Sequence, residues 1–137
     1  MSIKSNGDST IPITGGGGAQ NYTVGVTIDG IGAVPPIGQK GYRSIPVTGT
    51  IVSARLLADQ IGDAVMDVWL DTFGNYPPIV ADTITAAAKP TITADDNSED
   101  TTLTGWTTAV VAGDVLGFNL DSITAIQRIT LELEIAP

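Results

Sequence analysis

The sequence predicts an all-β fold, an antiparallel β-sandwich that is jelly-roll-like, behind a flexible, extended N-terminal arm. Three observations indicate this class. Residues 103–122 read as a strand, a tight turn and a second strand, with Trp106 before the turn and Phe118 after it to fill two facing layers. Residues 125–135 alternate between apolar and polar side chains. Glycine (16) and proline (8) are frequent, as in chains with many short strands joined by turns.

The composition bounds the size of the protein and its partners. A chain of 137 residues fits one domain with a single core. Six Lys and Arg against 15 Asp and Glu leave a net charge of −9, which argues against nucleic acid and against anionic lipid surfaces as partners. The chain has no Cys and no His. It therefore lacks thiolate nucleophiles, disulfides, imidazole metal sites and histidine acid–base chemistry, and we expect no cofactor.

No segment has the character of an export or membrane signal. The first ten residues lack the continuous apolar core of a signal peptide. No stretch approaches the ~20 apolar residues of a transmembrane helix. We expect a protein without membrane insertion that is made in a cytosol, or assembled there into something larger.

Residues 1–21 are expected to form an arm. Ser, Asn, Gly, Asp and Thr dominate it, and four glycines at 15–18 read as a hinge. They are not a phosphate loop, because no Lys-Ser or Lys-Thr follows and no strand precedes. The arm is either a frayed terminus or an anchor that becomes ordered against a partner. At about 3.3 Å per residue it reaches up to ~65 Å. Its candidate contact residues are Ile3, Ile11, Pro12 and Ile13.

The domain is expected to span residues 22–137 and to start with four strands. The first alternates in polarity and ends at Asp29-Gly30, before a loop with paired prolines that forbid a central strand. Pro46 suggests that the second is an edge strand or that the strand ends there. The third has apolar groups on both faces and should be central, and a turn at 58–63 should follow it. The four strands are predicted at 22–28, 41–47, 50–57 and 64–72.

The fourth strand carries candidate site residues. Alternation places Asp67, Trp69 and Asp71 together on the face that looks more solvated. Paired carboxylates can cleave glycosides, but Asp67 and Asp71 lie roughly 13 Å apart by strand rise. Both hydrolytic mechanisms need about 5–9.5 Å, so no catalysis is expected. Trp69 either stacks on a sugar ring or packs beneath the segment 73–90.

Residues 73–100 form the longest stretch expected to be irregular. A loop of this length in a compact domain is usually functional or packs on itself. The run from Asp95 to Asp100 holds four acidic residues. It is either a solvated loop or a Ca²⁺ site, although it lacks the spacing and the glycine of an EF-hand loop.

The last strand has the clearest pattern in the chain. Its outward residues should be Arg128, Thr130, Glu132 and Glu134, and its inward residues Ile129, Leu131, Leu133 and Ile135. Burying four aliphatic side chains gives an upper bound on the order of 6–12 kcal/mol. A shift of one residue in register would bury two Glu.

Four motifs together carry a family resemblance. They are DVWLDTFGNYPP at 67–78, LTGWTT at 103–108, AGDVLGFN at 112–119 and ITLELEI at 129–135. With the segments around them they cover about two-thirds of the chain. The chain resembles a small β-sandwich module of tailed bacteriophages, which occurs as a free virion protein or at the C-terminal end of fibre proteins. The resemblance implies a jelly-roll-like fold and assembly as a homotrimer on a capsid or a fibre tip.

The resemblance implies two alternative functions, and neither is enzymatic. An arm of some 20 residues without a long shaft favours a capsid decoration (cement) protein, whose arm contacts the major capsid protein in the virion, assembled in the host cytoplasm. The alternative is a tip module that recognises a host surface glycan. Its ligand or partner surface would comprise Trp69, Tyr76, Asp67 and Asp71, with the acidic run.

Overall fold

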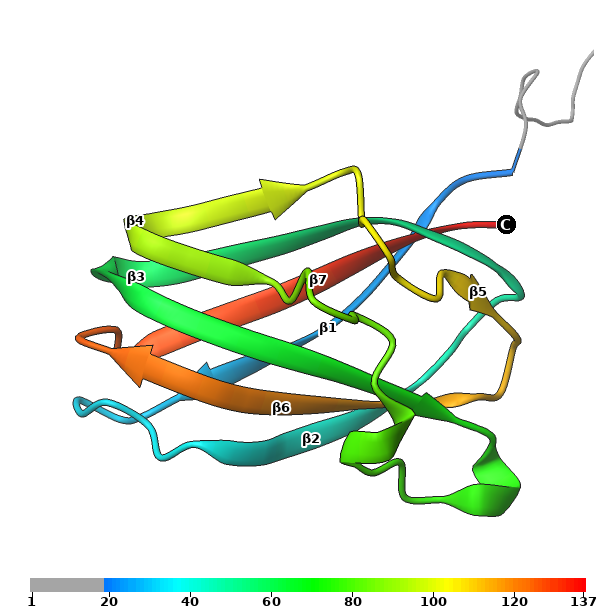
Figure 1. The fold of residues 1–137 in the computed structure, drawn as a ribbon, viewed down its shortest axis with the longest axis horizontal. Helices are drawn as coiled ribbons and strands as arrows, with labels where there is room; N and C mark the ends of the chain where they lie inside the picture. Colours follow the sequence, from blue (N-terminus) through cyan, green and yellow to red (C-terminus); the bar gives the residue numbers. More distant parts are fainter. Residues whose placement is uncertain (1–18) are drawn as a thin grey trace, which may run out of the picture.

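The structure, a computed structural model, describes residues 19–137 and is all-β (Figure 1). Every strand pair is antiparallel, so the predicted fold class is confirmed. The strands form one continuous sheet that is nearly closed into a barrel-like shape. The division into two layers of a jelly-roll sandwich stays a prediction. The strands are β1 Tyr22–Asp29, β2 Gly38–Ser44, β3 Gly49–Asp71, β4 Thr91–Asp100, β5 Ala109–Val110, β6 Val115–Thr124 and β7 Arg128–Ala136.

Strand β3 joins the parts of the sheet, whose order is β1-β7-β3-β6-β2, with β4 and β5 also paired to β3. Its first half pairs with β7 and its second half with β6, while β4 pairs with both halves. The turn predicted at 58–63 is instead a bend within this strand of 23 residues, where the register with β4 shifts. Gly62 permits the bend, because a Cβ atom there would collide with the carbonyl oxygen of Thr124.

The core confirms the pattern of the last strand. Ile129, Leu131, Leu133 and Ile135 of β7 are fully buried, and the residues between them are partly buried. They pack against apolar side chains of β1, β3 and β6, including Leu56, Met66 and Phe118. The sheet therefore encloses one core.

Two strand predictions are wrong in their positions, and one predicted loop is a strand. The second strand is β2 at 38–44 and ends before Pro46, because the buried Ile45 leaves the ladder to bond with Asp114. Only 109–110 of the stretch 103–110 is a strand, and Trp106 lies in the turn before it. The acidic run belongs to β4 and not to a loop, since pairing with β3 overrides the weak strand preference of Asp and Asn. Charged residues on an edge strand also discourage pairing with another chain.

Candidate functional site

Asp67 and Trp69 lie beneath a covering segment, so the prediction that they face solvent is wrong. Asp67 is 2% exposed and Trp69 is 9% exposed. The segment between β3 and β4 crosses this outer face of β3 and pairs with it: Ile84 donates its backbone N–H to Val68 at 2.9 Å, and Trp69 bridges to Thr83. The interpretation that Trp69 packs beneath the segment 73–90 is confirmed. The segment includes two short 3-10 helices, η1 Phe73–Asn75 and η2 Val80–Asp82.

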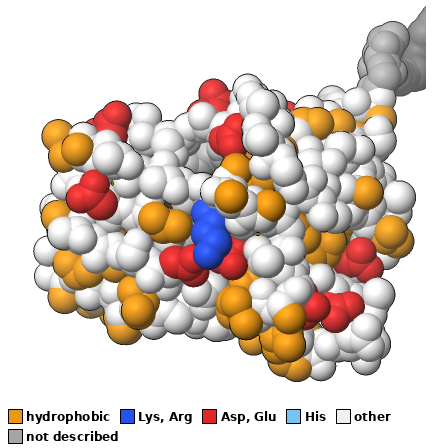
Figure 2. Space-filling model, in the orientation of Figure 1, with side chains coloured by type: hydrophobic (Ala, Val, Ile, Leu, Met, Phe, Trp, Pro, Cys, Tyr) orange, Lys and Arg blue, Asp and Glu red, His pale blue; other side chains and the backbone are white. Residues whose placement is uncertain are grey.

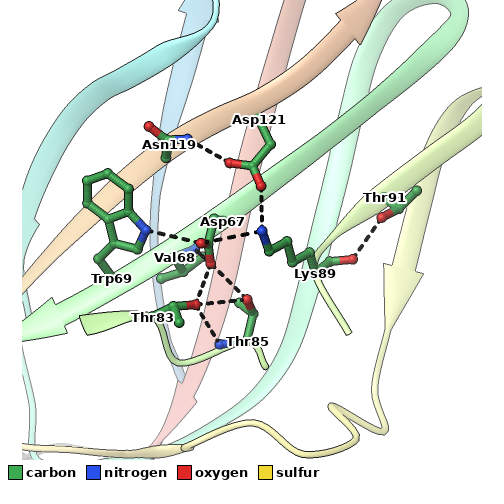
Figure 3. Close-up of polar contacts among 9 residues, drawn as sticks. All are labelled: Asp67, Val68, Trp69, Thr83, Thr85, Lys89, Thr91, Asn119 and Asp121. Atoms are coloured by element: carbon green, nitrogen blue, oxygen red, sulfur yellow. Dashed lines mark hydrogen bonds and ion pairs between the residues drawn. The ribbon is translucent and has the colours of Figure 1, made fainter. Parts of the chain in front are cut away.

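The Asp67 carboxylate holds the covering segment in place (Figure 3). Its Oδ1 accepts hydrogen bonds from the hydroxyls of Thr83 at 2.6 Å and Thr85 at 2.8 Å, and from the backbone N–H of Val68 at 2.8 Å. Its Oδ2 accepts one from Trp69 Nε1 at 3.1 Å. Both oxygens are therefore used by the fold, and the carboxylate serves to position the segment.

Lys89 completes this cluster from the end of the segment. Its Nζ lies 2.6 Å from Asp121 Oδ2, on β6, and 3.7 Å from Asp67 Oδ2. Asn119 donates to the other oxygen of Asp121 at 2.6 Å. The hydrogen bond and charge of Asp121 raise the pKa of Lys89. We call these residues the Asp67 cluster, comprising Asp67, Trp69, Thr83, Thr85, Lys89, Asn119 and Asp121.

The pKa of Asp67 reflects two opposing effects. Burial disfavours the charged carboxylate and raises the pKa, but hydrogen bonds from Thr83, Thr85 and Trp69 and the charge of Lys89 lower it. The lowering effects are stronger together, and the pKa lies below its usual value. Asp67 is therefore ionised at neutral pH and is a poor candidate for a general acid.

An aromatic groove lies beside the segment. It is lined by Tyr42, Arg43, Ser44, Phe73, Tyr76 and Val115 and has a volume of about 300 Å³. Phe73 and Tyr76 come from η1 and the residue after it, and Tyr42 comes from β2. Figure 2 shows hydrophobic side chains gathered at the lower edge of this face, where the segment lies in Figure 1.

An aliphatic end lies where three connections meet: the β1–β2 loop, the bend of β3 and the β6–β7 turn (Figure 1, left). Gly30 donates its N–H to Gln127 at 2.8 Å, and Asp59 accepts the N–H groups of Gln127 and Arg128 at 3.1 Å each. Ile31 is 89% exposed, with φ of 54°. The exposed aliphatic residues of this end are Ile31, Val34, Ile37, Leu57 and Ile61.

The structure separates the residues that the sequence grouped. Of the predicted ligand surface, Asp67 and Trp69 are buried, while Tyr76 is exposed in the aromatic groove. Asp71 is partly exposed and accepts hydrogen bonds from the N–H of Thr72 and from the side chain of Asn75 at the end of η1. The predicted arm contacts Ile3, Ile11, Pro12 and Ile13 lie outside the described residues.

Neither the aromatic groove nor the aliphatic end was predicted from the sequence. Tyr42 lies 34 residues before Tyr76, and only the pairing of β2 with β6 brings it to the segment. Ile31 carries one signal, since it stands between Gly30 and Gly32 in a predicted loop. Thr83 and Thr85 alternate with Ile84, which fits a short extended piece that places both threonines on one face.

Two observations limit what the described part can hold. Within residues 19–137, no group of three or more Asp and Glu side chains is placed to bind a metal ion. No helix in that range is long and apolar enough to span a membrane.

Comparison of the chain with protein-family models, with curated proteins and with solved structures finds no match.

Proposed function

We propose that the protein is a bacteriophage virion structural protein, a capsid decoration (cement) protein that binds the outer shell as a homotrimer and stabilises it. The virion setting rests on the family resemblance of the four motifs. The contact role rests on one observation at the aliphatic end, the backbone conformation of the exposed Ile31.

Ile31 has an unfavourable backbone conformation and little burial to compensate for it. A β-branched residue with positive φ is a genuine outlier, and such conformations cost on the order of 1–3 kcal/mol each. The side chain is 89% exposed, so packing within the domain returns little of this energy. The turn is held by the Asp29 carboxylate, which accepts the N–H of Ile31 at 2.7 Å. Strain of this kind is concentrated at functional sites, which supports a contact of Ile31 with a partner.

The partner of the aliphatic end is proposed to be the major capsid protein. Four further exposed aliphatic residues lie on the connections that meet at this end, and apolar surface of this kind favours burial against another protein. The arm is proposed as a second contact through Ile3, Ile11, Pro12 and Ile13. A ligand that binds only the assembled shell stabilises it by mass action.

Counting the copies in purified virions tests the virion assignment. Hundreds of copies, measured by mass spectrometry against the major capsid protein, would support decoration. A few to a few dozen copies would overturn decoration in favour of a tail or fibre tip. Complete absence would overturn any virion role.

Binding to shells that lack the protein tests the contact. We expect Ile31→Asp to weaken binding at least about tenfold, because a charge replaces an apolar contact. Val111→Asp is the matched control, since Val111 is 57% exposed and lies beside β5, away from the aliphatic end. Equal binding by the two variants would remove Ile31 from the interface. Deletion of residues 1–20 should leave the domain folded and abolish binding, and full binding by the deletion would exclude the arm.

A further inference from the structure

We propose that the aromatic groove binds a saccharide. This inference does not rest on the proposed function, because the groove and the aliphatic end are formed by different residues. A groove of about 300 Å³ is at the lower limit for small-molecule sites, which fits one or two sugar rings better than a large ligand.

The groove offers aromatic ring faces. The rings of Tyr42 and Tyr76 have centroids 5.0 Å apart at an interplanar angle of 64°, an edge-to-face arrangement. In this arrangement the ring whose edge points at its neighbour has neither of its own faces covered by that neighbour. Phe73 adds a third ring and is 75% exposed. Pyranose rings have an apolar C–H face that packs against such a surface.

The rim of the groove offers polar groups that can hydrogen-bond a ligand. The hydroxyls of Tyr42, Tyr76 and Ser44 make no hydrogen bond to another residue of the described range 19–137. Arg43, which also lines the groove, donates its Nε–H to the carbonyl of Gly25 on β1 at 3.1 Å. A ligand with one apolar face and a ring of hydroxyls matches an aromatic floor with such a rim.

The walls of the groove are already held in place. Gly117 on β6 has no side chain, so Pro78, Trp69 and Tyr42 approach it closely: an added Cβ would lie 3.2–3.5 Å from each of them. The segment that carries Phe73 and Tyr76 is fixed by the Asp67 cluster. A preformed site loses little conformational entropy when it binds a ligand.

The charge of the rim suggests which saccharides to test. Among the residues that the structure describes, Arg43 is the only charged one that lines the groove, and a guanidinium binds hydroxyls as well as carboxylates. The probes are therefore maltotriose, triacetylchitotriose and trigalacturonic acid, which present neutral, acetamido and acidic sugars.

Titration of the full chain by ¹H–¹⁵N NMR, up to about 10 mM of each probe, covers dissociation constants in the millimolar range. We expect at least one probe to bind and to shift the resonances of residues 42–44, 73–76 and 115–117. Tyr76→Ala and Phe73→Ala should each weaken binding of that probe by about tenfold or more. Phe73→Ala is included because its exposed ring can be removed without disturbing the fold.

Tyr22→Ala is the matched control, because Tyr22 is 47% exposed, much like Tyr76 at 50%, but lies on β1. It should bind the probe as the wild type does. Absence of binding by all three probes would overturn the proposal, as would shifts confined to other residues or equal binding by all variants. The virion copy number and shell binding do not enter this test, so either proposal can fail alone.

Discussion

Replacing Ile31 by glycine should stabilise the domain while weakening its proposed contact. Left-handed backbone costs a residue with a Cβ atom roughly 1–2 kcal/mol, and glycine avoids this cost. Glycine loses about 0.5–1 kcal/mol through the greater freedom of the unfolded chain. Little burial is lost, because the side chain is 89% exposed. The expected net change is a gain of about 0.5–1 kcal/mol in the free energy of unfolding.

Urea unfolding followed by tryptophan fluorescence measures this gain, since Trp69 and Trp106 are both buried. For a domain of this size the gain corresponds to a rise of about 2–3 °C in Tm. Ile37→Gly is the control in the same loop, because Ile37 is 63% exposed and its φ is not positive. The control should lose about 0.5–1 kcal/mol.

A loss of more than about 1 kcal/mol in Ile31→Gly would refute the reasoning, since it would mean that the Ile31 side chain contributes packing within the domain. Equal changes in the two variants would show that the positive φ carries no cost. If the gain in stability is observed together with weaker shell binding, the strain of Ile31 is maintained for the contact.

Three further predictions concern the buried residues. Asp67→Ala should lower the free energy of unfolding by about 3 kcal/mol or more in urea titration, because it leaves Thr83, Thr85 and Trp69 without their acceptor and each buried donor left unsatisfied costs about 1–3 kcal/mol, while Lys89 keeps its ion pair with Asp121; Asp71→Ala should cost about 1 kcal/mol or less, and equal losses would contradict the role of the Asp67 cluster. The ionised Asp67 contributes stability that is complete above its unfolded pKa of about 3.9 and is lost as pH falls through its lower folded pKa. The urea concentration at the midpoint of unfolding should therefore decrease as the pH is lowered through that acidic range. It should decrease less steeply in Asp67→Asn than in the wild type. Parallel pH profiles of the two proteins would exclude this residue as the cause. Leu131→Glu should abolish folding while Glu132→Leu should not, as judged by solubility and thermal melting; similar melting of both would refute the orientation of β7.

Local pattern alone determined the first and the last strand of the chain. β7 alternates between apolar and polar side chains without exception from Ile129 to Ile135. An alternation with a period of two residues is the pattern of a strand with one buried face. β1 was predicted at 22–28 and is observed at Tyr22–Asp29 for the same reason. Neither prediction required knowledge of the partner strand.

The tertiary structure decided where polar strands lie. Residues 95–100 have a composition typical of loops, yet they continue β4 because the long β3 offers them an unpaired edge. The stretch before β5 shows the converse. Its residues have the composition of a strand, but Trp106 lies outside the sheet and donates its indole N–H to the carbonyl of Ala88 at 2.8 Å. The position of Trp106 therefore depends on where the covering segment ends.

The candidate sites divide in the same way. The sequence by itself determined that β3 carries Asp67 and Trp69 on one face and that Ile31 lies in a glycine turn. Only the tertiary structure decided that the segment 73–90 covers that face and that Tyr42 of β2 meets Tyr76. Alternation assigns a side chain to a face of its own strand, but whether that face is solvated depends on what packs over it from elsewhere in the chain.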